Sequence, residues 1–380
     1  MANNNENKVL NVPHLRFPEF SGEWVTKSIN DLAVVIGGGT PDTTVKSYWD
    51  GEIQWFTPSE IGKNKYVDSS LRTITEVGLN NSSAKLLPPN TILLSSRATI
   101  GECSLSLREC ATNQGFQCLV SKKCNVDFLY YLIQTKKKDL IRKSCGSTFL
   151  EISANEVRKI QVSVPSDVEQ QKIAELLSLI DERIATQNKI IEDLKKLKSA
   201  IRKKMFSLLK DEYTESFEIN QLLDYEQPTA YIVANDEYST DTSLTPVLTA
   251  NKGFILGYTD EKFGIYQKGE CIIFDDFTMD AKYVSFPFKV KSSAIKILTA
   301  KPNVNLRFMF EYLSYWEFKS EEHKRHYISE IASLVIELPS KERQSIIASL
   351  MTSLNSKLDI EAKTKIRYEE QKRLLSQMFI

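Results

Sequence analysis

The sequence contains few of the residues that metal and redox sites require. It has three histidines, and none of its six cysteines forms a Cys-x-x-Cys pair. Zinc sites draw on closely spaced Cys and His ligands, so we expect no metal centre. The cysteines are Cys103, Cys110, Cys118, Cys124, Cys145 and Cys271. We expect them to be reduced and partly buried thiols.

Long apolar runs are also missing. No stretch of 18 apolar residues occurs, so a membrane-spanning helix is not expected. The first eight residues are polar and lack the apolar segment of a secretory signal. We therefore expect a cytoplasmic protein without a membrane partner.

Catalytic signatures are absent as well. The chain has no Gly-x-x-x-x-Gly-Lys-Ser/Thr loop, no Gly-x-Ser-x-Gly turn and no His-Glu-x-x-His pair. Gly37-Gly38-Gly39-Thr40-Pro41 follows an apolar run but lacks the glycine spacing of a dinucleotide site. These absences predict a non-catalytic chain that binds no cofactor of its own.

What the sequence does contain is an internal repeat. At a shift of 174 residues, Val164-Pro165-Ser166 matches Leu338-Pro339-Ser340, and Gln170 matches Gln344. Ile173-Ala174 matches Ile347-Ala348 at the same shift, which becomes 173 near the two Met-Phe pairs. Upstream, Asn125 to Tyr130 resembles Asn305 to Phe310. The chain therefore consists of two copies of one unit, a mixed domain followed by a long helix.

Each helix carries an apolar heptad stripe. In the first copy the stripe recurs every seven residues at Ile173, Ile180, Gln187, Leu194, Ile201 and Leu208, and we place Leu176, Ile184, Ile190, Ile191 and Leu197 beside it. In the second copy the stripe comprises Ile347, Leu350, Leu354, Leu358, Tyr368, Leu375 and Met378. Arg183 and Gln187 interrupt one stripe, and Lys357 and Glu361 the other. The simplest arrangement packs the two helices on each other, and the alternative is dimerisation of an exposed stripe with another chain.

The segment before each helix has a mixed α/β pattern. In the first copy we expect strands at Glu52–Phe56, Thr91–Leu94, Phe116–Val120 and Lys159–Val164, and a helix at Phe128–Thr135. In the second we expect strands at Thr245–Leu248, Cys271–Phe274 and Ala294–Leu298, and a helix at Leu306–Trp316.

Several phrases, in order, resemble the specificity subunits of type I restriction-modification systems. These phrases are Leu15-Arg16-Phe17-Pro18-Glu19-Phe20-Ser21-Gly22-Glu23-Trp24, Gly38-Gly39-Thr40-Pro41, Trp55-Phe56-Thr57-Pro58-Ser59-Glu60-Ile61, Val164-Pro165-Ser166 with Glu169-Gln170-Gln171-Lys172-Ile173-Ala174, Phe274-Asp275-Asp276-Phe277-Thr278 and Phe286-Pro287-Phe288-Lys289-Val290-Lys291-Ser292-Ser293. The resemblance covers nearly the whole chain and agrees with the duplication.

The resemblance implies a mixed α/β fold. Two target recognition domains in tandem duplication would be joined by two long helices that form an antiparallel coiled coil with pseudo-two-fold symmetry. The expected parts are recognition domain 1 (residues 1–164), the central helix (165–210), recognition domain 2 (211–338) and the C-terminal helix (339–380).

The resemblance also implies partners. Each domain would read one half of a bipartite double-stranded DNA target, and the coiled coil would set the spacer. Two methyltransferase subunits with S-adenosylmethionine, and two ATP- and Mg²⁺-dependent translocase-nuclease subunits, would complete the complex.

Polar side chains near the ends of the expected strands are the candidates for DNA contact, because such groups read base edges. In the first domain they are Thr40, Thr57, Ser59, Ser96, Arg97, Thr99, Asn113 and Gln114. In the second domain they are Thr249, Asn251, Lys252, Asp275, Asp276, Thr278 and Lys282. For each of them, a turn cap or a satisfied loop group is the alternative. Two basic clusters could either contact DNA phosphates or form a solvated helix face. One comprises Lys136–Lys138 with Arg142 and Lys143, and the other comprises the basic residues between Lys195 and Lys204.

The formal charge of zero conceals an uneven distribution. Residues 1–160, 161–210 and 341–380 each carry a net +3, whereas residues 211–340 carry 12 basic and 21 acidic residues, a net −9. The second domain therefore cannot attract DNA by bulk charge. We expect the chain alone to bind DNA poorly, with partners neutralising many of the phosphates. A coiled-coil scaffold without DNA readout is the competing function, and a fragment of a fused restriction-methylation enzyme is a third.

Overall fold

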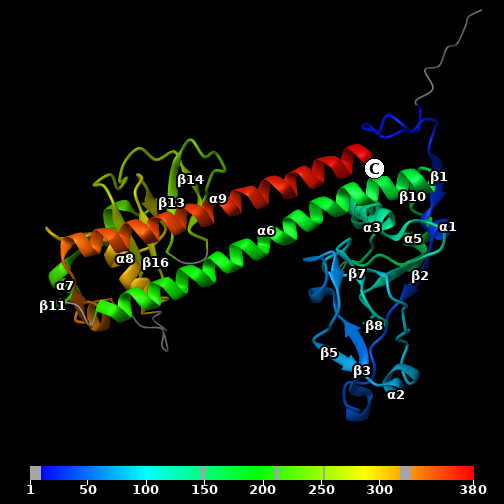
Figure 1. Cartoon of the computed structure of the whole chain (residues 1–380), viewed down its shortest axis with the longest axis horizontal. Coiled ribbons are helices and arrows are strands. Elements are labelled where there is room, and N and C mark those ends of the chain that lie inside the picture. The colour runs from blue at the N-terminus through cyan, green and yellow to red at the C-terminus, as the bar shows by residue number, and fades with distance from the viewer. Residues whose placement is uncertain (1–9, 147–149, 210–213, 251–252, 317–326) are drawn as a thin grey trace, which may run out of the picture. The chain divides into compact units, whose positions relative to one another are not determined.

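A computed structural model describes residues 10–146, 150–209, 214–250, 253–316 and 327–380. The chain divides into two compact units, Met1–Asn188 with Thr364–Ile380, and Lys189–Lys363. We call these unit 1 and unit 2. Each contains one α/β domain and parts of two long helices, α6 (Asp167–Leu208) and α9 (Lys341–Phe379) (Figure 1).

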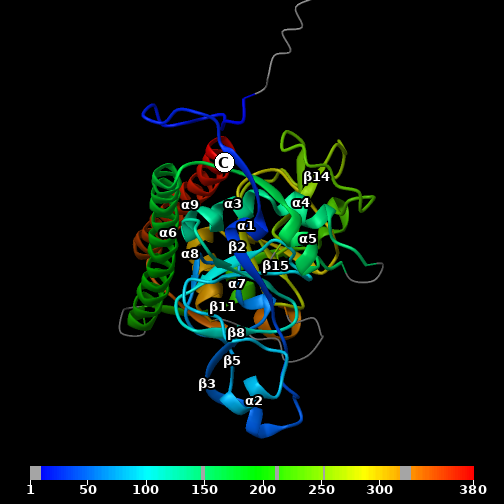
Figure 2. The same cartoon turned by 90° about the vertical axis from the view of Figure 1, so that its right-hand side faces the viewer.

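The domain of unit 1 contains three sheets. Their strand orders are β2-β9-β6-β7-β4, β5-β3-β8 and β1-β10. The strands are β1 (Val25–Ser28), β2 (Ala33–Gly37), β3 (Trp49–Phe56), β4 (Tyr66–Val67), β5 (Arg72–Ile74), β6 (Ile92–Leu94), β7 (Cys103–Ser106), β8 (Cys110–Thr112), β9 (Gln117–Ser121) and β10 (Gln161–Val164). The helices are α1 (Ile29–Leu32), α2 (Glu76–Asn80), α3 (Val126–Thr135), α4 (Lys137–Arg142) and α5 (Ala154–Lys159). Within this unit α3 lies against α6, and the sheet containing β3 and β5 lies at the remote end of the domain (Figure 2).

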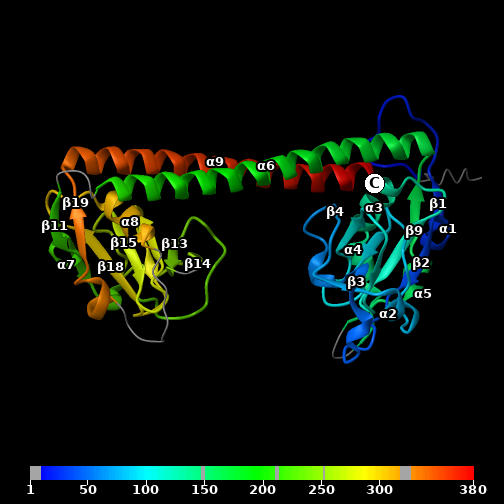
Figure 3. The ribbon, with the colours of Figure 1, turned by 60° about the horizontal axis from the view of Figure 1, so that its bottom comes forward.

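The domain of unit 2 repeats this plan, except that β4 has no counterpart among its described strands. Its strand orders are β12-β18-β15-β16, β14-β13-β17 and β11-β19. The strands are β11 (Glu215–Glu218), β12 (Leu223–Glu226), β13 (Thr245–Leu248), β14 (Ile255–Thr259), β15 (Cys271–Asp275), β16 (Ala281–Val284), β17 (Lys289–Val290), β18 (Ile295–Ala300) and β19 (Val335–Leu338). The helices are α7 (Ile219–Leu222) and α8 (Leu306–Tyr315), and α8 lies beside α6 (Figure 3).

Strand pairing confirms the duplication. In unit 1, β3 pairs antiparallel with β5 and parallel with β8. In unit 2, β13 pairs antiparallel with β14 and parallel with β17. A mixture of parallel and antiparallel pairs in one order is a specific arrangement, so its recurrence shows that both halves share one topology.

A buried glutamine ties each domain to the beginning of its helix. Gln170 Oε1 accepts a hydrogen bond from the Asn125 N–H at 3.0 Å, and its Nε2 donates to the Pro165 carbonyl at 3.0 Å. Gln344 repeats both bonds with Asn305 and Pro339, at 2.9 Å each. The matched residues of the repeat therefore have one structural role, which is to satisfy backbone groups where domain and helix meet.

The predicted secondary structure is confirmed with small shifts, apart from one boundary. The strand expected at Lys159–Val164 begins at Gln161, because Lys159 is the last residue of α5. The predicted strand Thr245–Leu248 matches β13 residue for residue.

The helices pack on each other within each unit. In unit 1, Ile173 and Leu177 of α6 share a core with Leu375 and Phe379 of α9. In unit 2, Phe206 and Met205 share a core with Ile347 and Met351. Early residues of one helix thus meet late residues of the other in either unit, which is antiparallel packing. The alternative of a stripe left for another chain is not needed for these residues.

The predicted composition of the stripe was partly wrong. Ile190 and Leu197 are 39% and 50% exposed. The helix seam alternates steps of four and three residues and passes through Ile173, Leu177, Ile180, Ile184, Gln187 and Ile191, which leaves both residues outside it. In α9, Leu350 and Met378 are similarly exposed and Met351 and Phe379 are buried instead.

Two of the four polar residues that interrupt the heptad stripes lie in the helix seam, as expected. Gln187 is buried, and the Glu361 side chain is only 13% exposed. Arg183 is exposed and the Lys357 side chain is 55% exposed, so both point away from the seam. Among the described residues, no helix is long and apolar enough to cross a membrane.

Candidate functional site

Three loops of the first domain converge at the ends of its strands. The Gly39 N–H donates to the Thr112 carbonyl at 2.8 Å, and the Trp55 indole donates to the Gly39 carbonyl at 2.9 Å. The Asn113 N–H donates to the Phe56 carbonyl at 3.1 Å. A Cβ on Gly38 would lie 2.0 Å from the Asn113 carbonyl oxygen, so this approach requires glycine. The loops that follow β2, β3 and β8 therefore form one polar surface.

Five predicted residues meet on this surface. Thr40 donates its hydroxyl to Gln114 Oε1. Thr57 precedes the short turn Pro58–Glu60, and its hydroxyl and N–H donate to Glu60 Oε2 at 2.6 and 2.8 Å. The hydroxyl oxygen of the exposed Ser59 lies 3.1 Å from that of Thr57. Asn113 Oδ1 accepts from the Gly115 N–H at 2.8 Å. Thr57 and Asn113 thus shape the loops, whereas Gln114 and Ser59 are exposed to solvent.

The loop after β6 adjoins the same surface. The Ser96 N–H donates to the Gly115 carbonyl at 2.8 Å, which brings Ser96, Arg97 and Thr99 beside the other candidates. Ser96 is fully buried, while Thr99 is exposed. Arg97 pairs with Glu151 at 2.9 Å, and both side chains are about two-fifths exposed (42% and 37%). Ala98 has a φ of 54°, a conformation costly for a residue with a side chain.

The corresponding loop of the second domain is organised by its two aspartates. Asp275 Oδ1 accepts from the Phe277 and Thr278 N–H groups, both at 2.9 Å. Asp276 is 1% exposed; its Oδ1 accepts from the Tyr327 N–H at 2.8 Å, and its Oδ2 lies 3.3 Å from Lys296 Nζ. Both carboxylates are therefore committed inside the domain. Reaching DNA would break these bonds, so the structure gives no support to the prediction that these two carboxylates read bases.

The remaining candidates of the second domain differ in accessibility. Thr278 is exposed and Lys282 on β16 is half-buried. Thr249 is 9% exposed, and its N–H donates to the Phe254 carbonyl at 3.0 Å. Asn251 and Lys252 lie outside the described residues.

Two buried lysines of this domain were missed from the sequence. Lys296 is 1% exposed and donates to Gln227 Oε1 at 3.1 Å in addition to its pairing with Asp276. Lys289 is fully buried, 2.8 Å from Glu261, and its ammonium donates to the Phe263 carbonyl at 2.9 Å. A lysine inside an apolar strand such as Ile295–Ala300 is a signal that could have identified them, because it needs a partner.

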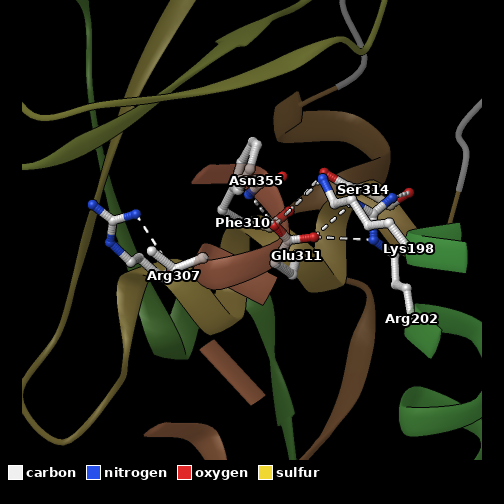
Figure 4. A network of polar contacts seen from close by, with 8 residues as sticks. Lys198, Arg202, Arg307, Phe310, Glu311, Ser314 and Asn355 are labelled. Carbon is white, nitrogen blue, oxygen red and sulfur yellow. Dashed lines mark hydrogen bonds and ion pairs between the residues drawn. The ribbon is translucent and has the colours of Figure 1, made fainter. Parts of the chain in front are cut away.

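Polar networks join each domain to the helices. In unit 2, Glu311 of α8 is 2% exposed and lies among Lys198, Arg202 and Asn355 (Figure 4). In unit 1, Tyr131 of α3 donates to Asp181 of α6, which pairs with Lys372 of α9. Lys198 and Arg202 belong to the basic residues for which a solvated outer face or phosphate contact was predicted. The outer face is wrong for these two residues, because both turn toward Glu311.

The predicted basic cluster of the first domain is largely paired. Lys137, Arg142 and Lys143 pair with Glu102, Asp139 and Glu156 respectively. Exposed pairs of this kind hold their partners weakly, so these cations remain able to exchange carboxylate for phosphate.

The thiols agree with the expectation of reduced cysteines. All six are free, and every one except Cys145 is buried. Burial raises the pKa of Cys103, Cys118, Cys124 and Cys271 to about 12, and that of Cys110 to about 11. These five thiols are therefore protonated at neutral pH and poorly nucleophilic. Among the described residues, no group of three His, Cys, Asp or Glu side chains is placed to hold a metal.

Curated relatives resemble parts of the chain. The type I restriction enzyme MjaIX specificity subunit of Methanocaldococcus jannaschii is 38% identical over 216 residues, 56% of this chain and 50% of the relative. The EcoR124I/EcoR124II specificity subunit of Escherichia coli is 40% identical over 149 residues, 37% of this chain and 36% of the relative. The chain thus spans half or less of the length of these relatives.

Solved structures share the fold across the chain. The S subunit of the type I restriction-modification system from M. genitalium aligns with a TM-score of 0.61 at 16% identity, covering 97% of this chain and 99% of that one. A chain from a study of complex assembly and conformational transition in a type I R-M system aligns with a TM-score of 0.58 at 12% identity, covering 94% and 97%.

A family model spans both copies of the repeat. The model of the type I restriction modification DNA specificity domain matches residues 21–196 and again residues 212–370. The two matches include both α/β domains and most of both long helices. The chain belongs to the family of type I restriction modification DNA specificity domains.

Proposed function

We propose that this protein is the specificity subunit of a type I restriction-modification complex and that each α/β domain reads one half of a bipartite DNA target. The observation that carries this proposal is the recurrence of one strand order in both units, with polar loops at corresponding strand ends. A duplicated reader suits two separated half-sites, because each copy needs to recognise only a few base pairs.

The exposed side chains on the loops are the proposed readers. In the first domain Gln114 is the leading candidate, because it is exposed and its amide can both donate and accept at a base edge. Ser59, Thr99 and Arg97 lie on the adjoining loops. In the second domain Thr278 and Lys282 remain, together with Asn251 and Lys252 as untested candidates. We assign Thr40, Thr57, Asn113 and Thr249 a supporting role in loop conformation.

The helices are proposed to set the spacer between half-sites. Helix α6 has 42 residues, which at 1.5 Å per residue is a rod of about 60 Å. Insertion of a heptad into both α6 and α9 preserves the seam and lengthens the rod. The preferred DNA spacer should then increase, and an unchanged spacer would contradict this role.

The partners supply the chemistry in this proposal. We propose that methyltransferase subunits carrying S-adenosylmethionine, and ATP- and Mg²⁺-dependent translocase-nuclease subunits, assemble around this chain in the cytoplasm, and that the chain itself is non-catalytic. The net −9 of residues 211–340 supports dependence on partners, because the second domain gains little from phosphate attraction.

The test uses the full chain and its partner methyltransferase subunit on a DNA library with randomised sequence. Sequencing of the methylated molecules should give two short half-sites separated by a fixed number of unspecified base pairs. Omission of this chain should abolish site selection. If the library is methylated equally without it, the chain is a scaffold without DNA readout, and the proposal fails.

A further inference from the structure

Three corresponding positions meet where each domain contacts the helices. The first position lies on the short helix of the domain and is occupied by Tyr131 on α3 and by Glu311 on α8. These two residues match at a shift of 180 residues, the shift that also aligns Asn125 with Asn305. The other two match at the shift of 174 and lie on the long helices: Asp181 with Asn355, and Lys198 with Lys372. We call Tyr131, Asp181 and Lys372 the first anchor, and Glu311, Asn355 and Lys198 the second anchor.

In the first anchor the carboxylate belongs to the long helix. Tyr131 Oη donates to Asp181 Oδ2 at 2.7 Å, and Lys372 Nζ lies 2.7 Å from Asp181 Oδ1. The Asp181 and Lys372 side chains are only 17% and 20% exposed. Lys372 Nζ also lies 5.3 Å from the centre of the Tyr131 ring, so the domain helix offers it a neutral aromatic face.

In the second anchor the carboxylate belongs to the domain. Asn355 Nδ2 donates to Glu311 Oε1 at 3.2 Å, and Lys198 Nζ lies 3.9 Å from the same oxygen. Arg202 adds two bonds to Glu311 Oε2, at 3.0 and 2.6 Å. Figure 4 shows Glu311 between Asn355 on one side and the two cations on the other.

Each anchor therefore provides one carboxylate for its lysine. In the first anchor this carboxylate comes from the long helix, and in the second it comes from the domain. A poorly solvated ammonium without a carboxylate is destabilising, and two adjacent carboxylates repel each other. Burial indeed lowers the pKa of Lys198, an effect that Glu311 opposes. A tyrosine on the domain requires an aspartate on the helix, and a glutamate on the domain requires a neutral amide there.

We infer that the two anchors are matched residue pairs that fix the orientation of each recognition domain on its helices, and thereby the spacing at which each half-site is presented. Tyr131 and Asp181, and likewise Glu311 and Asn355, are positioning residues that can be exchanged only together. This inference rests on the proposed function for its effect on DNA, whereas the anchoring itself concerns the chain alone.

The anchoring is tested by hydrogen exchange of the full-length chain carrying Asp181→Asn, Tyr131→Glu or both. Each single change should reduce the protection of α3 amides by about tenfold, because the lysine loses its carboxylate or two carboxylates meet. The double variant has the glutamate and the amide of the second anchor but no counterpart of Arg202, because the matched position is Ser376. It should still recover part of the protection. Asp193→Asn, at an exposed site on α6, and the amides of α8 are the controls, and both should be unchanged. If the double variant loses as much α3 protection as the two single variants combined, the residues are not a matched pair and the inference fails.

Tyr131→Phe keeps the buried ring and removes the hydroxyl, with its bond to Asp181 and its longer bond to Ser178 at 3.3 Å, so it serves if Tyr131→Glu fails to fold. It should reduce α3 protection by a smaller factor than Asp181→Asn. Equal protection of Tyr131→Phe and the unchanged chain would also overturn the inference.

The positioning role is tested by methylation of DNA whose spacer is one base pair longer or shorter than the optimum. With the partner methyltransferase subunit present, Asp181→Asn should raise the rate on these spacers about threefold relative to the optimal spacer, because a loosened domain accepts more geometries. Half-site sequence preference should not change, and the double variant should regain the narrow spacer preference. Lost protection of α3 without any broadening would refute the positioning role. If the unchanged chain directs no site-specific methylation, the proposed function fails, while hydrogen exchange still decides whether the anchors exist.

Discussion

The two domains share one backbone plan but differ in the polar groups inside it. The Ser96 N–H in unit 1 and the Asp276 N–H in unit 2 make the same bond, to the carbonyl of Gly115 or of Ala294. The side chains at that position are a fully buried serine hydroxyl in one domain and an aspartate paired with a buried lysine in the other. Backbone pairing is therefore retained through the duplication, while buried polar positions change in matched sets.

The contacts between each domain and the long helices show the same division between constant backbone bonds and variable side-chain bonds. Gln170 and Gln344 satisfy backbone groups, which are present whatever the sequence, and both are unchanged. The anchors satisfy side chains, which can change, and the carboxylate has moved from Asp181 on the helix to Glu311 on the domain.

The largest expected effect is on the buried pair of the second domain. Lys296→Met leaves the Asp276 carboxylate buried without its cation, and should destabilise this domain by about 3–5 kcal/mol. Hydrogen exchange of β18 amides measures the loss, and β9 of the first domain is an internal reference. Lys291→Met, at an exposed site, is the matched control. A loss below about 1 kcal/mol would mean that the pair does not distinguish the two domains.

An intermediate effect is expected from the shared glutamines. Gln170→Ala and Gln344→Ala should each cost about 1–3 kcal/mol, because buried backbone groups at Asn125 or Asn305 lose their partner. Each change should weaken only its own unit, as measured by exchange of α3 and α8. If one glutamine proves dispensable, the two junctions are not equivalent.

The smallest expected effect is a pH response of the second domain. A hydrogen bond from Lys289 is the largest cause that holds the pKa of Glu261 below its usual range. A carboxyl with a lowered pKa stabilises the fold above the pKa of the unfolded chain, about 4.3, and this contribution is lost as the pH falls below that value. Exchange of β17 amides should therefore show a smaller loss of protection on acidification in Glu261→Gln than in the unchanged chain. An identical pH response would exclude this pair as its source.

Much of the fold was predictable, because it depends on periodic patterns. The repeat, the helix pair and most strands follow from apolar spacing and from proline and asparagine at element boundaries. The residues of the helix seam were only partly predictable, since Ile190 and Leu197 have the right spacing for a heptad but the wrong angular position on α6.

The site was less predictable, because loop residues and buried pairs depend on contacts distant in sequence. The sequence marks Asp275 and Asp276 equally as polar residues after a strand. Only the structure shows Asp275 capping a turn and Asp276 facing Lys296. The convergence of Thr40 with Gln114, 74 residues apart, likewise requires the sheet arrangement. Exposure then separates Gln114 and Ser59 from the neighbours that shape the loops.

We propose that two independent readers lie in one chain, and Gln114→Ala is the decisive test of this proposal. Methylated sites are sequenced from one randomised library treated with the partner methyltransferase subunit and either the unchanged chain or the variant. We predict a bipartite site in which the variant relaxes one half, while the other half and the spacer stay unchanged. A continuous site, or relaxation of both halves together, would contradict the account.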